Sequence, residues 1–293
     1  MAFRLQQPRI DELADIVHTL SRWQHDGAPV QLHPGDLGWH WRFGAQVVAE
    51  AVRIWTGDSG IVAIGFLDGA GLVRMGIAPE FGDDGGLAGR IVDDLSDPAR
   101  GILPTREATV EARAGAALRA LLAERGWLAD DPWIPLHREL TGAVARPGND
   151  RLRVETVAAD RAQQWLDVVR VAFGSAAPPP ERWANLAGSP MFQGLHGRCL
   201  IGYDEQDRAV AAVAVWSAGP GRPGLVEPMG VHDRHRGHGH GAGITRAAAA
   251  ELRSMGSSSA VVATPAARSA AVATYVAAGF RASGAVTDFR RPD

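Results

Sequence analysis

A glycine-rich segment with a basic side chain joins a strand-like stretch to a helix-like stretch, and its residue types suit anion binding. Residues 231–243 read V-H-D-R-H-R-G-H-G-H-G-A-G. Ile244, Ala248, Leu252 and Met255 then repeat at helical spacing. The first turn of a helix leaves backbone N–H groups unbonded and carries an effective charge of roughly +0.5. A phosphate group can therefore be held where this helix begins.

Glycines at three alternate positions of the segment would let the backbone approach a ligand without Cβ atoms in the way. Arg236 could add a bidentate guanidinium contact. A tight connection in a glycine-heavy chain is the alternative interpretation of the same pattern. We predict a pyrophosphate site formed by Arg236, Gly237, His238, Gly239, His240 and Gly241.

A second signal follows the loop in chain order. Residues from Ala271 through Tyr275 to Gly279 and Phe280 read A-x-x-x-Y-x-x-x-G-F. Together the two segments resemble the GCN5-related N-acetyltransferase (GNAT) superfamily, whose central motif is V-x-P-x-y-R-G-x-G-x-G/A. The match consists of Val231, His235, Arg236, Gly237, Gly239 and Gly241.

The resemblance is incomplete at two positions. Asp233 stands at the proline of the family motif, and Arg268 stands where many members have Asn. The second departure leaves the contacts at the start of that helix uncertain. The resemblance covers residues 151–293 well and residues 1–140 only as an order of elements.

The resemblance implies that acetyl-coenzyme A lies between two parallel strands that move apart, here 226–231 and 259–264. Pro228 lacks a backbone N–H and Gly230 has no side chain, as expected where a strand ladder is bulged or interrupted. The backbone of Met229, Gly230 and Val231 would then bind the pantetheine amide like an added strand.

Acyl transfer to an amine needs a base for the attacking nitrogen and an acid for the departing thiolate. The resemblance makes Tyr275, one of two tyrosines, the candidate acid. The alternative is a core tyrosine whose hydroxyl bonds the backbone. Glu227 shares a strand face with Met229 and Val231 by period-two alternation, which makes it the candidate base, acting directly or through water. A solvated strand residue is the alternative.

A metal site and a dinucleotide site both fit the loop less well than a pyrophosphate site does. The four histidines 232, 235, 238 and 240 alternate with glycines and lack the closed geometry of a zinc site, so we expect no metal. The pattern G-x-G-x-x-A also resembles a dinucleotide fingerprint. That motif follows its strand at once and expects an acidic residue about 20 positions on, whereas five residues intervene here and strand 259–264 ends at Pro265.

Composition removes several classes of protein. All 30 basic residues are arginine, which excludes a Schiff-base lysine and a Walker A loop. A net charge of −3 gives no basis for nucleic-acid binding across the chain. Cys199 is the single cysteine, the first residues lack an apolar signal core, and no window is apolar enough to span a bilayer. We expect a cytoplasmic protein without a membrane partner, and a homodimer is compatible with the sequence.

Length and element order predict two domains. The segment 141–150, rich in Gly, Pro, Asn and Asp, separates lobes 1–142 and 150–293. Each lobe shows several strands followed by alternating helices and strands, including strands at 46–55 and 286–290. We predict an α/β fold (α+β mixed sheet) of two tandem GNAT-like acyl-CoA N-acyltransferase lobes.

The N-terminal lobe lacks the phosphate-binding residues. Aligned as a repeat, Gly82, Asp83 and Asp84 stand at the loop, and Leu122 stands opposite Tyr275. Two carboxylates at that position would repel a diphosphate by more than a helix terminus attracts it. We expect this lobe to have lost coenzyme binding and to be structural or to shape the acceptor site.

The function expected from these observations is transfer of an acetyl group from acetyl-CoA to a primary amine of a small molecule. A segment at 174–192 would lie on the acceptor side, where Trp183, Met191 and Phe192 either meet a partly apolar acceptor or belong to the core. The alternative function is a catalytically silent acyl-CoA-binding regulatory protein of the same fold.

Overall fold

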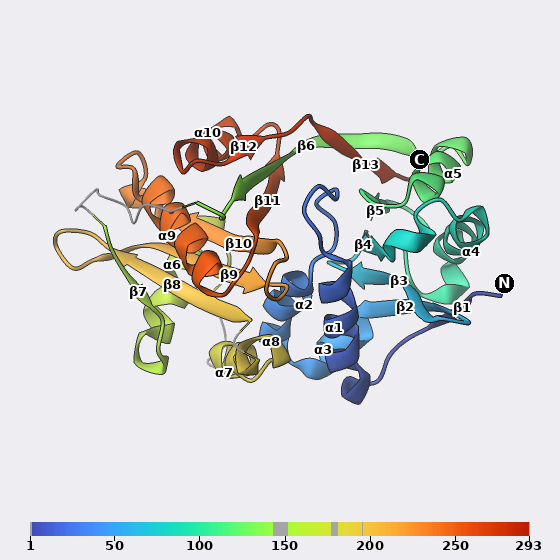
Figure 1. The fold of residues 1–293 in the computed structure, drawn as a ribbon, viewed down its shortest axis with the longest axis horizontal. Helices are drawn as coiled ribbons and strands as arrows, with labels where there is room; N and C mark the ends of the chain where they lie inside the picture. The colour runs from blue at the N-terminus through green and yellow to red at the C-terminus, as the bar shows by residue number, and fades with distance from the viewer. Residues whose placement is uncertain (1, 143–151, 177–180, 195, 293) are drawn as a thin grey trace. The chain divides into compact units, whose positions relative to one another are not determined.

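The computed structural model describes residues 2–142, 152–176, 181–194 and 196–292 (Figure 1). Packing divides the chain into two units, each formed by more than one segment of the sequence. Unit 1 contains Met1–His33, Ala45–Trp133 and Ala285–Asp293, and unit 2 contains Pro34–Gly44 and Ile134–Gly284. The boundary predicted at 141–150 falls mostly on residues outside the described ranges. Two short segments therefore belong to the unit formed mainly by the other half of the sequence.

Unit 1 contains a mixed sheet in the order β1-β2-β3-β4-β5-β13-β6. β4 and β5 are parallel, and the other neighbours are antiparallel. Its strands are β1 (Arg4–Gln6), β2 (Val52–Gly57), β3 (Gly60–Leu67), β4 (Leu72–Ile77), β5 (Thr109–Glu111), β13 (Val286–Arg290) and the first part of β6 (Leu128–Glu139). Its helices are η1 (Ile10–Glu12), α1 (Leu13–Trp23), α3 (Ala45–Ala51), η3 (Pro79–Phe81), α4 (Gly85–Ser96), η4 (Pro98–Arg100) and α5 (Ala116–Glu124).

One face of this sheet packs on α4 and α5. Val73 and Val110 from neighbouring strands share a buried cluster with Ile91 of α4 and Leu118 of α5. Because successive strand residues face opposite sides of a sheet, the strand residues next to Val73 and Val110 point away from these helices. The apolar periodicity that predicted the helices in this half thus places their buried stripes on the sheet.

The C-terminal strand β13 is fixed in unit 1 by a buried ion pair as well as by its ladder. The Arg113 guanidinium donates to both carboxylate oxygens of Asp288, at 3.3 and 3.2 Å. Arg74 Nε donates to Glu111 on the neighbouring strand at 3.1 Å. Since Arg113 and Asp288 are almost fully buried, each needs its partner. The ion pair thus links the last strand to a residue 175 positions earlier in the sequence.

Unit 2 contains strands in the order β6-β11-β10-β9-β8-β7, with β12 pairing β6. β10 and β11 are parallel, and β7, β8, β9 and β10 form an antiparallel series. Its strands, besides the rest of β6, are β7 (Arg153–Thr156), β8 (Gly197–Tyr203), β9 (Ala209–Ser217), β10 (Gly224–Val231), β11 (Ser259–Pro265) and β12 (Arg281–Ala282). Its helices are α2 (Pro34–His40), η2 (Trp41–Phe43), η5 (Ala159–Arg161), α6 (Ala162–Phe173), α7 (Glu181–Ala187), α8 (Pro190–Gln193), η6 (Asp233–His235), α9 (His240–Ser254) and α10 (Ser269–Ala277).

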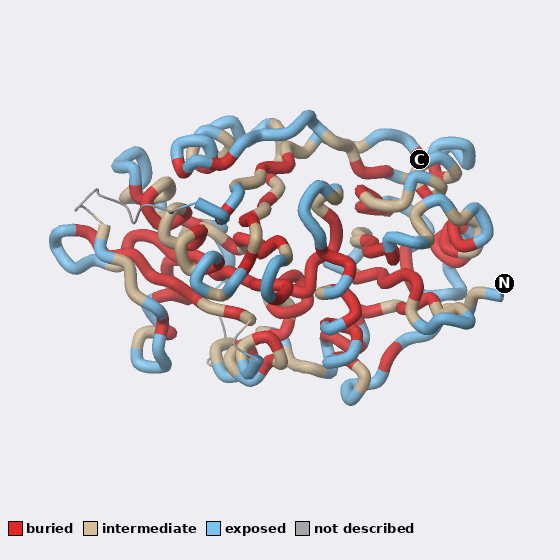
Figure 2. Tube along the Cα trace, viewed as in Figure 1, coloured by how far each residue is buried: buried red, intermediate tan, exposed pale blue. Residues whose placement is uncertain are grey.

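Strand β9 lies at the centre of this core and is buried along nearly its whole length (Figure 2). Val213 and Val215 join a cluster with Ile244 of α9. The next residue, Trp216, is fully buried against α2. Period-two alternation therefore places α9 and α2 on opposite faces of the sheet.

Helix α2 packs its backbone directly on the indole of Trp216. A Cβ atom added at Gly35 would lie 2.5 Å from Trp216 Cβ and Cγ, and one at Gly38 would lie 2.6 Å from Cζ3. Two glycines three positions apart occupy one face of a helix, so they form a flat surface for the indole. No helix was expected at these positions from the sequence.

The Gly35→Ala variant is expected to unfold at a lower temperature than the parent. Overpacking costs about 1–3 kcal/mol, and a contact of 2.5 Å with the Cβ and Cγ atoms of Trp216 places the cost at the upper part of that range, above the gain of about 1 kcal/mol in helix propensity from Gly to Ala. Gly89→Ala is the matched control, because a Cβ there meets nothing within 4 Å in helix α4. Thermal denaturation should show a decrease in Tm for Gly35→Ala and an increase for Gly89→Ala. Equal increases would contradict the close packing on Trp216.

Candidate functional site

Strands β10 and β11 separate after two paired residues. Only Gly224 and Leu225 pair with β11, at Ala260 and Val261. The register of β10 with β9 shifts between Val226 and Met229, and the bond between Glu227 and Pro228 is cis. The predicted bulge and separation of these strands are therefore confirmed. The edge of β10 beyond Leu225 has no strand partner on the β11 side among the described residues.

Met229, Gly230 and Val231 lie on this separated part of β10. On the other side they pair with Val213, Ala212 and Ala211 of β9. A Cβ at Gly230 would lie 2.5 Å from Cβ of Ala172, at the end of α6. Gly230 therefore allows α6 to approach the strand closely, a role that was not expected from the sequence.

The loop between β10 and α9 exposes a run of free backbone donors. Gly237 and Gly239 both have φ +81°, a left-handed conformation that favours glycine, and a Cβ at either position meets nothing within 4 Å. The backbone N–H groups of residues 237–242 donate to no acceptor in the described part of the protein. Glycine is thus required here by backbone conformation, and the resulting turn leaves six amides available to a ligand.

The charges at this loop favour an anion. The side chain of Arg236 donates to the carbonyls of Ala172, at 3.0 Å, and Val231, at 3.4 Å, and has no carboxylate partner among the described residues. The rings of His238 and His240 stack with centroids 5.9 Å apart. Burial lowers the pKa of His240, which favours its neutral form near pH 7. The fixed positive charge beside the free amides therefore comes from Arg236 and the start of α9.

A close contact between α9 and α10 brings the second motif to the same region. A Cβ at Gly241 would lie 2.9 Å from Cγ2 of Thr274, so the small residue lets α10 approach. The next residue, Tyr275, is 6% exposed and its ring lies 5.8 Å from that of Phe280. Its hydroxyl has no hydrogen-bond partner among the described residues. Tyr275 is therefore a core residue of unit 2 whose hydroxyl lacks a backbone partner among the described residues, and its role as the acid stays a prediction.

Glu227 and Tyr275 come within electrostatic reach of each other. Burial raises the pKa of Tyr275, and the charge of Glu227 raises it further. The backbone of Glu227 is held by Trp216, whose Nε1 donates to the Glu227 carbonyl at 2.6 Å. The charge of Glu227 thus acts on the Tyr275 phenol, although the two residues lie on a strand and a helix distant in sequence, and their roles as base and acid stay predictions.

An aromatic series occupies the acceptor side predicted at 174–192, of which residues 177–180 lie outside the described ranges. Trp165 contacts Trp183, Trp183 contacts Phe192, and Phe192 contacts Trp216, with ring centroids 5.6–6.4 Å apart. Met191 is buried near Gly38 of α2. Met191 therefore belongs to the core, whereas Trp183 and Phe192 are half-buried, and a contact of these two with the acceptor stays a prediction. The sequence analysis missed helix α2, and the signal that could have indicated its contact with Trp216 is the pair of glycines at 35 and 38.

The matching turn of unit 1 is closed by its own groups. The Asp84 side chain accepts a hydrogen bond from Leu87 N at 2.8 Å and so caps α4. The N–H of Ala117 donates to the Gly82 carbonyl at 3.1 Å, and Leu122 is fully buried. A carboxylate thus occupies the helix terminus where unit 2 presents free amides.

Metal-ligating clusters and membrane-spanning helices are both absent from the described residues. No group of three or more His, Cys, Asp or Glu side chains there is arranged to hold a metal ion. No helix in the described ranges is both long and apolar enough to cross a membrane. The expectation that the protein works without a metal stays a prediction.

The comparisons with known proteins agree with this geometry. Residues 162–280 match the Acetyltransferase (GNAT) family. This stretch includes the separated strands, the loop and the helix of Tyr275. The matched stretch is a GNAT-family domain within unit 2, and the predicted α/β fold of two GNAT-like units is confirmed.

Solved structures similar to the whole chain include a GCN5-related N-acetyltransferase from Sphaerobacter thermophilus, with 17% identity, a TM-score of 0.58, and coverage of 99% of this chain and 95% of that one. A GNAT-family acetyltransferase from Colwellia psychrerythraea has 13% identity, a TM-score of 0.61 and 99% coverage of both chains. A tandem GNAT protein from the clavulanic acid biosynthesis pathway has 12% identity, a TM-score of 0.61, and coverage of 99% and 98%. No curated protein sequence matches the chain. At these identities the likeness establishes the fold and not the substrate.

Proposed function

We propose that this chain is an acetyl-CoA-dependent N-acetyltransferase that acts on a primary amine of a small molecule, with its chemistry in unit 2. One observation carries the proposal: six consecutive backbone amides, at residues 237–242, have no acceptor in the described part of the chain and stand beside Arg236 at the start of α9. Such an arrangement suits a diphosphate. It stands next to a strand edge that lacks a partner among the described residues, where a pantetheine chain can bind as an added strand.

In the proposed binding mode, the coenzyme occupies the gap between β10 and β11. The diphosphate accepts hydrogen bonds from residues 236–241, and the backbone of Met229, Gly230 and Val231 binds the pantetheine amide. The thioester then points along the gap toward the bulge at Glu227. Recognition rests mainly on backbone groups, so few side chains are needed.

The proposed reaction joins the amine nitrogen to the thioester carbonyl carbon and breaks the carbon–sulfur bond. Glu227 takes the proton of the attacking nitrogen, directly or through water. Tyr275 gives its proton to the departing thiolate, which is a base comparable to a cysteine thiolate, whose thiol has a pKa of about 8.5. The products are an amide and coenzyme A, and the proton on Glu227 restores the phenol of Tyr275 through solvent.

Unit 1 is proposed to be structural or to shape the acceptor site, without binding coenzyme. The Asp84 cap supports this assignment, because its carboxylate accepts from the Leu87 amide, which would otherwise be available to a phosphate. The expected cytoplasmic location, the absence of nucleic-acid and membrane partners, and the compatibility with a homodimer stay predictions.

The test of this function combines binding and turnover. Coenzyme A at 100 times its dissociation constant should stabilise the protein by about 2.7 kcal/mol, seen as a rise in Tm. Release of free thiol from acetyl-CoA is then measured over a panel of small primary amines, with no amine as the control. Turnover with at least one amine is expected. A rise in Tm without thiol release would instead favour the silent acyl-CoA-binding protein, and no rise would refute both.

A further inference from the structure

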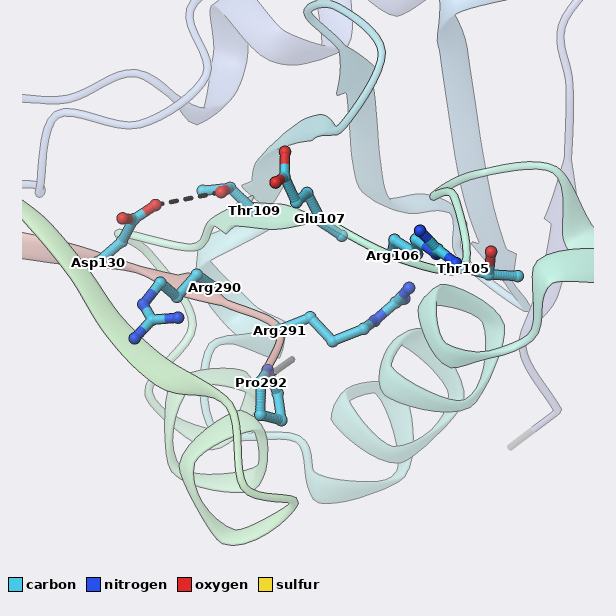
Figure 3. Close-up of a pocket in the computed structure, with 9 residues that line it drawn as sticks. Thr105, Arg106, Glu107, Thr109, Asp130, Arg290, Arg291 and Pro292 are labelled. Carbon is cyan, nitrogen blue, oxygen red and sulfur yellow. Dashed lines mark hydrogen bonds between the residues drawn. The ribbon is translucent and has the colours of Figure 1, made fainter.

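A pocket lies in unit 1, lined by residues of the segment before β5, by Asp130 and by the residues at and after the end of β13. Strand β13 ends at Arg290, which pairs with Thr109, and the last link is the hydrogen bond from Arg291 N to Ala108 O at 2.8 Å. Beyond it, the segment before β5 and the end of the chain diverge. A cavity of about 580 Å³ opens between them (Figure 3). Its volume falls in the range of about 300–1,000 Å³ that is typical of small-molecule sites.

Three arginines line this pocket, and none of them has a carboxylate partner in the described part of the chain. Arg291 donates to the carbonyls of Pro104 and Leu95, and its guanidinium lies 5.2 Å from the ring of Trp127. Burial lowers the pKa of Arg291, because only neutral groups replace the water that is lost. The side chains of Arg106 and Arg290 are exposed and form no hydrogen bond or ion pair with any described residue.

The two acidic residues at the pocket do not neutralise these arginines. Asp130 accepts hydrogen bonds from Thr109 Oγ1 at 3.1 Å and from Asp131 N at 2.9 Å. The Glu107 carboxylate points to the side of its segment away from Arg291 (Figure 3). In Figure 3 the guanidinium of Arg291 points toward Arg106, whereas that of Arg290 points the opposite way. The pocket therefore offers an acceptor the exposed guanidinium of Arg106 beside that of Arg291, which is fixed in place by two carbonyls and an indole.

We propose that this pocket binds a small molecule that carries phosphate or carboxylate groups. Guanidinium groups match both oxyanions through paired N–H donors. The net charge of −3 for the chain argues against a long polyanion as the ligand, and the size of the cavity fits a metabolite. The site is separate from the proposed acetyl transfer, because none of its residues belongs to unit 2.

The test is calorimetric titration of the full chain with inorganic phosphate and, separately, with citrate, at constant ionic strength. Saturable one-to-one binding of at least one probe is expected, and the preferred probe identifies the headgroup. Arg106→Gln should weaken that binding about tenfold or more, since a hydrogen bond to a charged group contributes about 1.5–3 kcal/mol. Arg290→Gln, on the other side of β13, should weaken it less. Both side chains are exposed and form no hydrogen bond or ion pair with a described residue, so the variants should keep the parent Tm.

Two controls separate this site from other anion sites. Arg4→Gln removes an exposed arginine from the same unit and should leave the affinity unchanged. Arg236→Gln alters the loop of unit 2 and should also leave it unchanged. The proposal is overturned if neither probe gives saturable heat, if the double variant at 106 and 290 binds like the parent, or if only Arg236→Gln loses binding. The proposed acetyltransferase activity is untouched by any of these results.

Discussion

Replacing Tyr275 with Phe is expected to lower kcat for acyl transfer by about 10²- to 10⁴-fold, the usual contribution of a positioned general acid. The substitution removes only the hydroxyl, which has no hydrogen-bond partner among the described residues. No structural bond is lost, so stability and coenzyme affinity should remain close to those of the parent. Steady-state kinetics with the amine found active, together with a coenzyme titration, measure the two effects separately.

The other tyrosine provides the matched control. Tyr203 is also buried, but its hydroxyl donates to Gln164 at 2.7 Å and accepts from Arg161 at 3.1 Å. Tyr203→Phe should therefore lose about 1 kcal/mol of stability and keep its kcat. A Tyr275→Phe enzyme with parental kcat would remove Tyr275 from the mechanism.

The pH profile adds a signature of the same residue. Burial raises the pKa of Tyr275, so its neutral, proton-donating form is present below that raised value and is lost only as the pH passes it. A free tyrosine phenol has a pKa of about 10. Between about pH 7 and that value, the rate of the parent enzyme should therefore show no fall caused by ionisation of Tyr275. A decline in kcat over that interval, absent in Tyr275→Phe, would show that the phenol ionises in the ordinary range.

Gly239→Asp is expected to abolish most coenzyme binding. Two unit charges 4 Å apart repel by about 1 kcal/mol in water and about 4 kcal/mol at an effective dielectric of 20. The Kd for coenzyme A should therefore rise by a factor between about five and several hundred. The carboxylate would also be able to cap α9 and use amides proposed for the diphosphate, as Asp84 does in unit 1.

Gly27→Asp controls for backbone strain in this experiment. Gly27 has φ +83° and Gly239 has φ +81°, and a Cβ at either position meets nothing within 4 Å. The two variants should lose similar stability, because both force a side chain into the left-handed region. Only the variant at 239 should lose coenzyme affinity. Equal Kd values for the two would mean that the diphosphate binds elsewhere.

Local sequence determined the elements that carry the candidate site. The left-handed conformations at Gly237 and Gly239, and the bulge around Pro228, follow from properties of single residues and their immediate neighbours. Turn chemistry and side-chain periodicity act over a few positions, so they are readable without the fold. For the same reason the order of strands and helices in unit 2 followed the prediction closely.

The prediction was wrong at one apolar segment whose pattern fits both a helix and a strand. The apolar run at 46–55 predicts a strand, yet Ala45–Ala51 is helical and only Val52–Gly57 is strand. The helix buries Val48, Ala49 and Ala51, and the strand that follows begins at the buried Val52. A short apolar run fits either structure until the surface that buries it is known.

What only the tertiary structure decided is which distant residues meet. The sequence placed a strand at 286–290 but did not show that Asp288 pairs with Arg113 in unit 1. Nor did it show that α2 covers Trp216, or that Tyr275 lies near Glu227. Conformational preferences depend on a residue and its immediate neighbours, so short stretches of sequence are enough to predict them. Burial and partner choice depend on contacts between residues many positions apart, which no short stretch contains.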